Sequence, residues 1–361
     1  MKAFNGAVQS FAWAVNFGII SNWFPRKGRG VLIGIWATNP NVGDIFGQQL
    51  YLLFVDSGIE HWGYTFLTLG CAVELVAVLN LIFLVEYPQK KGIVIREKAT
   101  ILNPEVASDH NDDLDEANNT AAGGRQDEVM DNEEIGNVSF GSALCIRGVL
   151  AYSFSFFFAK FAYYGVYYWV PTYLQEKLGY SETEAGNITS LGSVGGIIGS
   201  ITMGFLSDIL NVRSPVHLVA SAIGALSLSL ITSYQDDSHE AWLTFLLMSF
   251  SIFEGGATIV IAIIMCDIGK NYLHEHKKKA VATISGICDG VAGFGSILGQ
   301  VLLGPVKKNN DWTAAFAMFS GAAIAACLPS IPYTISEVSR HCKRKKHIKG
   351  TDEQKNDDSA T

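Results

Sequence analysis

A lysine interrupts one of the most apolar stretches of the chain, SFSFFFAKFAYYGVYYWVPTYL. Lys160 is followed at helical spacing by four tyrosines: Tyr163, Tyr164, Tyr167 and Tyr168. A helix therefore places one ammonium and several phenol hydroxyls on a single stripe. In a dry cavity an ammonium binds phosphate or carboxylate, and phenols orient the rest of a polar substrate. The alternative is a lysine that snorkels along an aromatic face towards water.

Three acids occur in equally apolar surroundings: Asp44, Glu254 and Asp289. Each has three possible roles: a proton relay, an ion-pair partner for Lys160, or a neutral packing group held by hydrogen bonds. Glycines flank all three acids and allow neighbouring helices to approach closely.

The elements that must position these residues are membrane-spanning helices. The chain is 49% hydrophobic and 17% charged, with a mean hydropathy of +0.24, which is unusual for a water-soluble globule of 361 residues. A spanning helix needs about 20 mostly apolar residues. Nine stretches meet this requirement: 4–20, 30–55, 62–85, 149–174, 185–206, 216–234, 241–266, 280–306 and 312–334.

The distribution of Lys and Arg predicts the orientation, because positive flanks stay in the cytoplasm. Of the 26 Lys and Arg residues, 21 lie on one side of the predicted membrane and 4 on the other. The central loop and the C-terminus are therefore predicted to be cytoplasmic. The domains expected are residues 1–85 with three spans, an acidic disordered linker at 86–144, six spans at 145–335, and a tail at 336–361.

Three spans before a long loop and six after it match a transporter built from two six-helix halves, with the first three helices absent. We therefore expect a fragment in preference to a first helix that inserts as a reverse anchor. Such a chain should show little or no transport by itself.

The stretch from Gly204 to Asp208, followed by Arg213, resembles the loop motif of the major facilitator superfamily. In that family an acid and a base of this motif latch the cytoplasmic ends of helices. Four longer stretches resemble the sugar-phosphate exchangers, the glycerol-3-phosphate and glucose-6-phosphate branch of the organophosphate:phosphate antiporters: NWFPRKGRGVLIGIWATNPNVGDIFG, FFFAKFAYYGVYYWVPTYL, SLGSVGGIIGSITMGFLSD and ISGICDGVAGFGSILGQ.

The resemblance implies an all-α helical bundle equivalent to helices 4 to 12 of twelve, which exchanges an organic phosphate for inorganic phosphate by alternating access. Lys160 then stands on the seventh helix, one turn before a bacterial arginine position that Tyr163 occupies. Asn39 and Asn41 flank the proline that replaces a bacterial histidine, so a histidine-dependent step is not expected there. The substrate-site residues expected are Lys160, Tyr163, Tyr164, Tyr167, Asn39 and Asn41.

No enzyme activity, cofactor, metal or nucleic acid is expected. The chain has no GxxxxGK[ST] loop for ATP. Two other classes stay open: a proton-coupled carrier for another organic anion or sugar, which would use the buried acids, and a non-transporting receptor or scaffold. The location favoured is the endoplasmic reticulum or another endomembrane rather than the plasma membrane.

Overall fold

The computed structural model describes residues 2–24, 28–56, 62–92, 136–233, 240–276, 279–307 and 312–343, and these residues are almost entirely helical. Within these ranges no strand occurs, and the one isolated bridge pairs Asn137 with Lys279. The predicted all-α class is confirmed. Most of the predicted linker, at 93–135, and most of the tail, at 344–361, lie outside the described residues.

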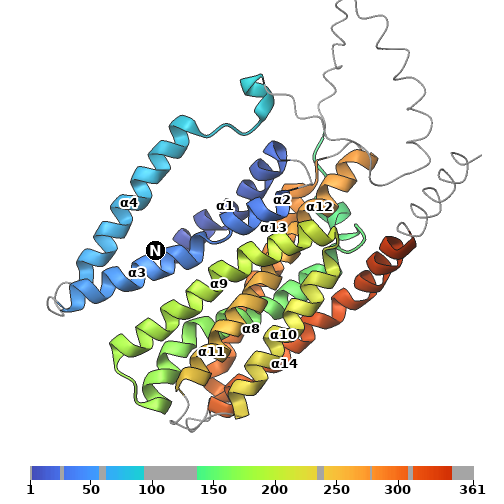
Figure 1. Cartoon of the computed structure of the whole chain (residues 1–361). Helices are drawn as coiled ribbons and strands as arrows, with labels where there is room; N and C mark the ends of the chain where they lie inside the picture. Colours follow the sequence, from blue (N-terminus) through green and yellow to red (C-terminus); the bar gives the residue numbers. More distant parts are fainter. Residues whose placement is uncertain are drawn as a thin grey trace, which may run out of the picture.

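The first three predicted spans correspond to four helices before the central loop, and the last six lie in the helices that follow it (Figure 1). The elements before the central loop are α1 (Lys2–Trp23), α2 (Arg29–Trp36), α3 (Asn39–Asp56), α4 (Trp62–Phe83) and the 3-10 turn η2 (Pro88–Lys91). Those after it are α7 (Phe140–Leu144), α8 (Val149–Leu178), α9 (Glu182–Leu210), α10 (Ser214–Ser233), α11 (Glu240–Phe250), η5 (Ser251–Gly255), α12 (Gly256–His276), α13 (Val281–Val306), α14 (Trp312–Cys327) and η7 (Leu328–Ser330), with further helix over 331–343.

Within the described residues, seven helical segments are long and apolar enough to cross a membrane, and they coincide with seven of the nine predicted spans. The other two predicted spans, at 4–20 and 30–55, are helical but are not among the seven; a turn at residues 37–38 divides the second of them into α2 and α3. Two boundaries differ from the predicted ones. The short helix α7 lies inside the predicted linker, and the last helix continues to Lys343.

Local sequence explains how the α8–α9 hairpin is fixed. α8 ends at Gly179, whose φ of 71° is the left-handed conformation that glycine adopts without a Cβ penalty. α9 begins with a capping box: the Ser181 hydroxyl accepts from the Glu184 amide, while the Glu184 carboxylate accepts from the Ser181 amide. The tight connection sets α8 and α9 antiparallel.

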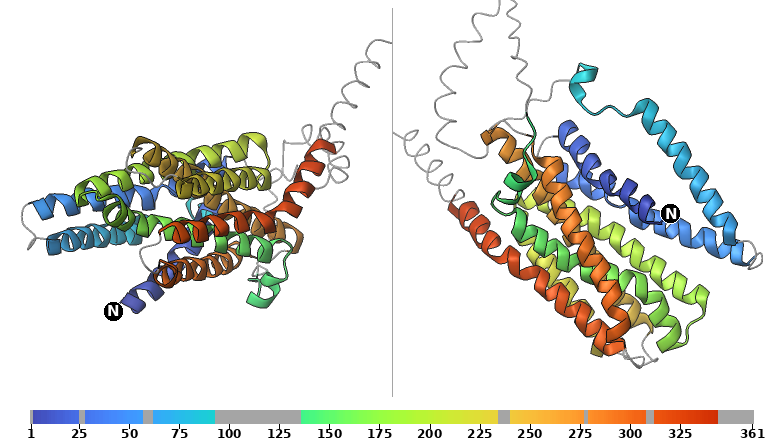
Figure 2. Two further views of the ribbon diagram at one scale, coloured as in Figure 1. Left: turned by 90° about the horizontal axis from the view of Figure 1, so that it is seen from below. Right: turned by 180° about the vertical axis from the view of Figure 1, so that it is seen from behind.

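α8 is the central helix of the C-terminal bundle. It packs most extensively on α13 and α14, while α10 packs on α14, α11 and α12 (Figure 2). The contact with α13 is close, because a Cβ atom at Gly295 would clash with the Phe157 carbonyl. α2 and α3 lie along α9, and α1 lies along α13. α4 stands at the margin beside α3, and none of its apolar window is buried.

One end of the bundle gathers α7, the α9–α10 turn and the end of the last helix, as both figures show. Ring contact between Tyr152 and Tyr333, with centroids 5.2 Å apart, joins α8 to the last helix near this end. We call it the basic end, because the sequence analysis assigns most of the Lys and Arg of the chain to this side of the predicted membrane.

The structure gives the topology a direct test through two exposed thiols at the basic end, Cys145 and Cys342. In variants that retain only one of these cysteines, a membrane-impermeant maleimide is expected to label both from the same side of sealed vesicles. Cys71 on α4 is exposed in the structure but lies within a predicted span, so it should react slowly and serves as the control. Labelling of Cys145 and Cys342 from opposite sides would exclude the predicted topology.

Candidate functional site

Lys160 forms an ion pair with Asp289 between α8 and α13. The Lys160 Nζ lies 2.5 Å from Asp289 Oδ1, and the two side chains are 15% and 26% exposed. The ammonium also lies over the Phe156 ring, 4.6 Å from its centroid, and over the Tyr164 ring at 5.9 Å. The lysine therefore has a counter-ion and aromatic faces around it at membrane depth, which is the arrangement expected of a charge that faces a cavity rather than lipid.

The tyrosines that follow Lys160 form two stacked pairs along α8. Tyr163 stacks on Tyr167, with centroids 6.1 Å apart, and Tyr164 stacks on Tyr168 at 5.9 Å. The Tyr163 hydroxyl lies 3.5 Å from Oδ1 of Asn41 on α3. The stripe predicted from spacing is therefore continuous in space, and its hydroxyls reach residues of the first predicted half.

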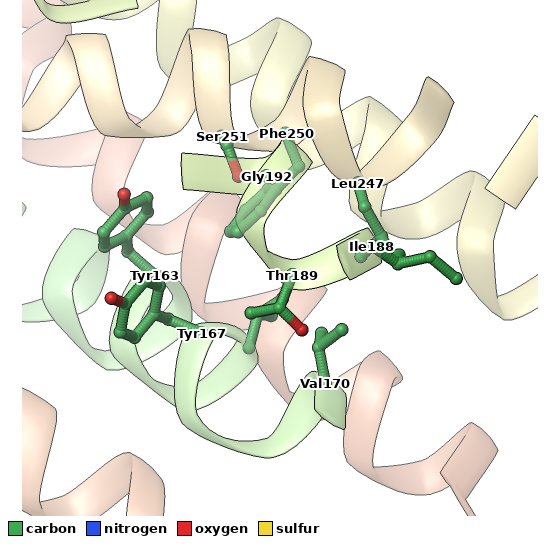
Figure 3. Close-up of a pocket in the computed structure, with 10 residues that line it drawn as sticks. Tyr163, Tyr167, Val170, Ile188, Thr189, Gly192, Leu247, Phe250 and Ser251 are labelled. Carbon is green, nitrogen blue, oxygen red and sulfur yellow. The ribbon is translucent and has the colours of Figure 1, made fainter. Parts of the chain in front are cut away.

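A small cavity lies against the first of these pairs. Figure 3 shows the Tyr163 and Tyr167 rings on one side of it, with Phe250 and Ser251 across from them. Its volume of about 30 Å³ holds a water molecule or two. It is too small for a phosphate ester, so substrate entry requires the surrounding helices to move. The lining residues are Tyr163, Val166, Tyr167, Val170, Ile188, Thr189, Gly192, Leu247, Phe250 and Ser251.

Asp44 and Asn41 of α3 contact the tyrosines of α8 and residues of α9. The Ser193 hydroxyl of α9 donates to Asp44 Oδ2 at 2.5 Å, and the Tyr167 hydroxyl also contacts this carboxylate. Asn41 is buried against Gly196, where an added Cβ would lie 2.5 Å from the Asn41 Oδ1. Glycine at 196 is thus required for α9 to receive the amide.

Two other predicted residues lie elsewhere. Asn39 is exposed, and its side-chain amide donates to the Trp36 carbonyl at 2.8 Å, so it caps the local turn and does not join the tyrosines. Glu254 is completely buried in the π-turn η5, away from the Lys160 pair. Asp44 and Asp289 are each half-buried with a polar partner, whereas Glu254 is the one acid of the three without exposure.

Asp208 and Arg213 meet at the basic end, as the resemblance implies. Arg213 Nη1 lies 2.6 Å from Asp208 Oδ1, and the other Asp208 oxygen accepts from the Val31 amide of α2 at 3.0 Å. Two residues that sequence analysis did not assign complete the cluster. The Asp267 carboxylate of α12 receives Arg29 at 3.2 Å and Arg213 at 3.3 Å. We call Arg29, Asp208, Arg213 and Asp267 the latch.

The latch joins the two halves of the sequence in a nearly dry setting. Arg29 is 1% exposed, and the side chains of Arg213 and Asp267 are 7% and 8% exposed. Glu337 of the last helix adds a further tie by accepting the backbone amides of Arg213 and Ser214 at 3.0 and 2.9 Å. The signal missed in the sequence was an acid, Asp267, at the end of a span close to cationic flanks.

Glycines allow the two halves to approach at the latch. A Cβ atom at Gly30 would lie 2.7 Å from the Gly204 carbonyl, and one at Gly34 would clash with the Ser200 carbonyl. α2 and α9 therefore touch backbone to backbone beneath the latch. At the basic end α2, α9 and α12 are therefore in mutual contact.

Long apolar helices, a charged pair at membrane depth and a glycine-lined latch between two halves define a multi-pass membrane carrier. The chain belongs to the Major Facilitator Superfamily: the sequence profile of that family matches residues 2–272 and 152–350. It is a carrier and not an enzyme.

The similarity to sugar-phosphate exchangers predicted from the motifs is confirmed. The chain is 29% identical to the glucose-6-phosphate exchanger SLC37A2 of Bos taurus over 335 residues, 91% of this chain and 67% of that protein. It is 31% identical to the sugar phosphate exchanger 3 of Bos taurus over 87% of this chain and 63% of that protein. It is 27% identical to the putative glycerol-3-phosphate transporter 1 of Arabidopsis thaliana over 94% and 64%. The chain thus spans about two thirds of the length of these relatives.

Proposed function

We propose that this chain forms part of a carrier that exchanges a sugar phosphate or glycerol phosphate for inorganic phosphate by alternating access. The observation that carries the proposal is the Lys160–Asp289 pair beside the tyrosine stripe. Residues 1–85 and 145–335 would supply the two walls of the substrate path, joined by the linker at 86–144. The basic end would face the cytoplasm.

The ion pair suggests how phosphate is bound. Lys160 already has a counter-ion, so a phosphate must displace the Asp289 carboxylate or share the ammonium with it. The tyrosine hydroxyls, Asn41 and Ser193 then offer uncharged partners for the remaining oxygens of phosphate and for the hydroxyls of a sugar or glycerol. A site with one lysine among phenols selects the phosphate group, and the neutral partners select what is attached to it.

Exchange is expected because a carrier with an unpaired charge in its substrate site reorients at a high free-energy cost. Bound phosphate loosens the Lys160–Asp289 pair. When the phosphate leaves, these two charges must pair again before the bundle can reorient through the membrane. An incoming phosphate ester restores the balance at once. Occupied carriers should therefore reorient faster than empty ones.

The test is counterflow in liposomes. Labelled phosphate is loaded inside, and phosphate, glucose 6-phosphate, glycerol 3-phosphate or glucose is added outside. The three phosphate compounds are expected to release label, while glucose, which lacks the phosphate, is the matched control and should release none. Equal release by glucose and glucose 6-phosphate would exclude a phosphate-selective exchanger.

We further expect the 361-residue chain alone to show little or no counterflow. No part of the apolar stretch of α4 is buried against other described helices. The chain also matches only 67% of the length of the SLC37A2 relative. The measurement compares this chain with the full-length SLC37A2 relative. Saturable exchange by the short chain at the rate of the longer one would contradict this expectation.

A further inference from the structure

Glu254 is a fully buried acid whose carboxyl oxygens both lack a hydrogen-bond partner among the described residues. Ser221 of α10 faces this carboxyl, and its buried hydroxyl also lacks a hydrogen-bond partner among the described residues. Gly224, one turn further along α10, leaves the space for Glu254, because a Cβ there would lie 3.0 Å from its Oε2. The carboxyl is thus enclosed by α10 with no cation against it in the described part of the chain.

An isolated carboxylate in this position would cost several kcal/mol. The lysine at membrane depth is already paired with Asp289 and does not serve Glu254. The titratable groups that face Glu254 from packed elements are Tyr163 of α8 and Cys327 at the end of α14, and neither supplies a positive charge. In this conformation Glu254 therefore holds a proton.

His217, one turn before Ser221, is the titratable side chain of α10. It is fully buried, with Nε2 3.0 Å from the Ser155 Oγ and Nδ1 3.3 Å from the Ala257 carbonyl. The Ser155 hydroxyl donates its own proton to the Ala326 carbonyl at 2.5 Å. Buried with no acid against it among the described residues, the imidazole is neutral and donates to one of these two acceptors, so His217 supplies no positive charge to Glu254.

The position of Glu254 connects it to the substrate site. It lies in the π-turn η5, and Ser251 of the same turn lines the cavity of Figure 3. The next residue, Gly255, touches Tyr163, since a Cβ there would lie 3.2 Å from the ring. π-turns inside α-helices occur often at functional sites, where the extra residue disrupts the regular hydrogen-bond ladder.

We propose that Glu254 is a proton-binding site of the carrier and exchanges its proton with water. A change in the π-turn that opens the cavity beside Tyr163 to water would release the proton, and closure would take it up again. Proton movement would thereby be coupled to phosphate movement. The coupling rests on the proposed exchange function, whereas the protonated state of Glu254 does not.

The first experiment needs no transport. Infrared spectroscopy of the purified chain at neutral pH is expected to show the carbonyl stretch of a buried carboxylic acid, which Glu254→Gln removes and Glu254→Asp retains. The matched control is Glu182→Gln, an exposed acid at the start of α9, which should leave the band unchanged. A band that survives Glu254→Gln, or that is absent from the unaltered chain, overturns the proposal. If Glu254→Gln does not insert, Glu254→Asp decides: a band whose frequency and pH dependence are the same as in the unaltered chain overturns the proposal as well.

The second experiment measures whether proton movement drives phosphate movement. It uses the exchange-competent protein, meaning a form of the carrier that shows counterflow in liposomes. For one coupled proton, a gradient of about one pH unit is expected to drive about tenfold accumulation of labelled phosphate. Glu254→Gln should abolish this accumulation, and Glu254→Asp should restore part of it. Equal gradient-driven accumulation with and without Glu254→Gln overturns the coupling. Absence of exchange at every pH in the unaltered protein instead overturns the proposed function, and the infrared result then still decides whether Glu254 holds a proton.

Discussion

Replacing Lys160 by glutamine is expected to lower phosphate exchange by about 100-fold or more in the exchange-competent carrier. Truncating one member of a buried, hydrogen-bonded charge pair costs about 2–5 kcal/mol, and here the lost member is also the proposed phosphate ligand. The measurement is initial counterflow of labelled phosphate at equal amounts of inserted protein. Lys160→Arg should recover part of the rate, since it keeps the charge with a larger planar head.

A double variant separates binding from simple ion pairing. Lys160→Gln leaves the Asp289 carboxylate without the ammonium that lies 2.5 Å away. Lys160→Gln with Asp289→Asn removes both charges and relieves that imbalance. If Lys160 binds phosphate, the double variant stays inactive; if the pair only stabilises the α8–α13 contact, exchange returns.

Asp289→Asn alone is the matched single control. It frees the ammonium without removing it, so phosphate no longer has to displace a carboxylate. We expect exchange to persist with a lower KM for phosphate. Exchange at the unaltered rate in Lys160→Gln, or recovery in the double variant, would remove Lys160 from the phosphate site.

The sequence predicted seven of the nine expected spans and the tyrosine stripe because both depend on local spacing, whereas the Asp208–Arg213 contact was implied by the family resemblance. Hydropathy over a span and helical periodicity act within a few turns of one helix. Arg213 lies five residues from Asp208, within a single turn between helices. These features need no knowledge of which helices become neighbours.

The remaining contacts join distant segments and were not predicted by spacing. Lys160 and Asp289 are 129 residues apart, and Arg29 and Asp267 are 238 apart. The sequence left three roles open for Asp289. It indicated for Arg29 only that it is one of the cations on the predicted cytoplasmic side. The π-turn at Glu254 was also invisible, since an extra residue in a helical turn leaves the hydropathy pattern almost unchanged.

Asp267→Asn is expected to open the basic end of the carrier. The substitution removes the carboxylate that receives both Arg29 and Arg213, while Asp208 stays paired with Arg213. Losing one partner of a buried ion pair costs about 3–5 kcal/mol. That cost falls on the closed conformation, in which α2, α9 and α12 meet, so the population should shift towards the open one by about 100-fold.

Cys266 reports this opening directly. It is completely buried next to Asp267, and its Sγ lies 3.9 Å from Arg29 Nη1. In a background in which the other cysteines are replaced, Asp267→Asn should raise the rate at which a maleimide labels Cys266 by about the same 100-fold factor. Glu337→Gln is the control, because its amide oxygen still accepts from a backbone N–H of the α9–α10 turn and should change the rate little.

The result that separates a latch from a structural salt bridge combines two measurements. A structural bridge predicts that Asp267→Asn lowers the Tm while Cys266 stays protected until the protein unfolds. A latch predicts faster labelling well below the Tm, together with slower exchange, since a carrier held open at one end completes fewer cycles. Protection of Cys266 in Asp267→Asn at the level of the unaltered protein would show that the Arg29–Asp267–Arg213 cluster stabilises the fold without governing access to the site.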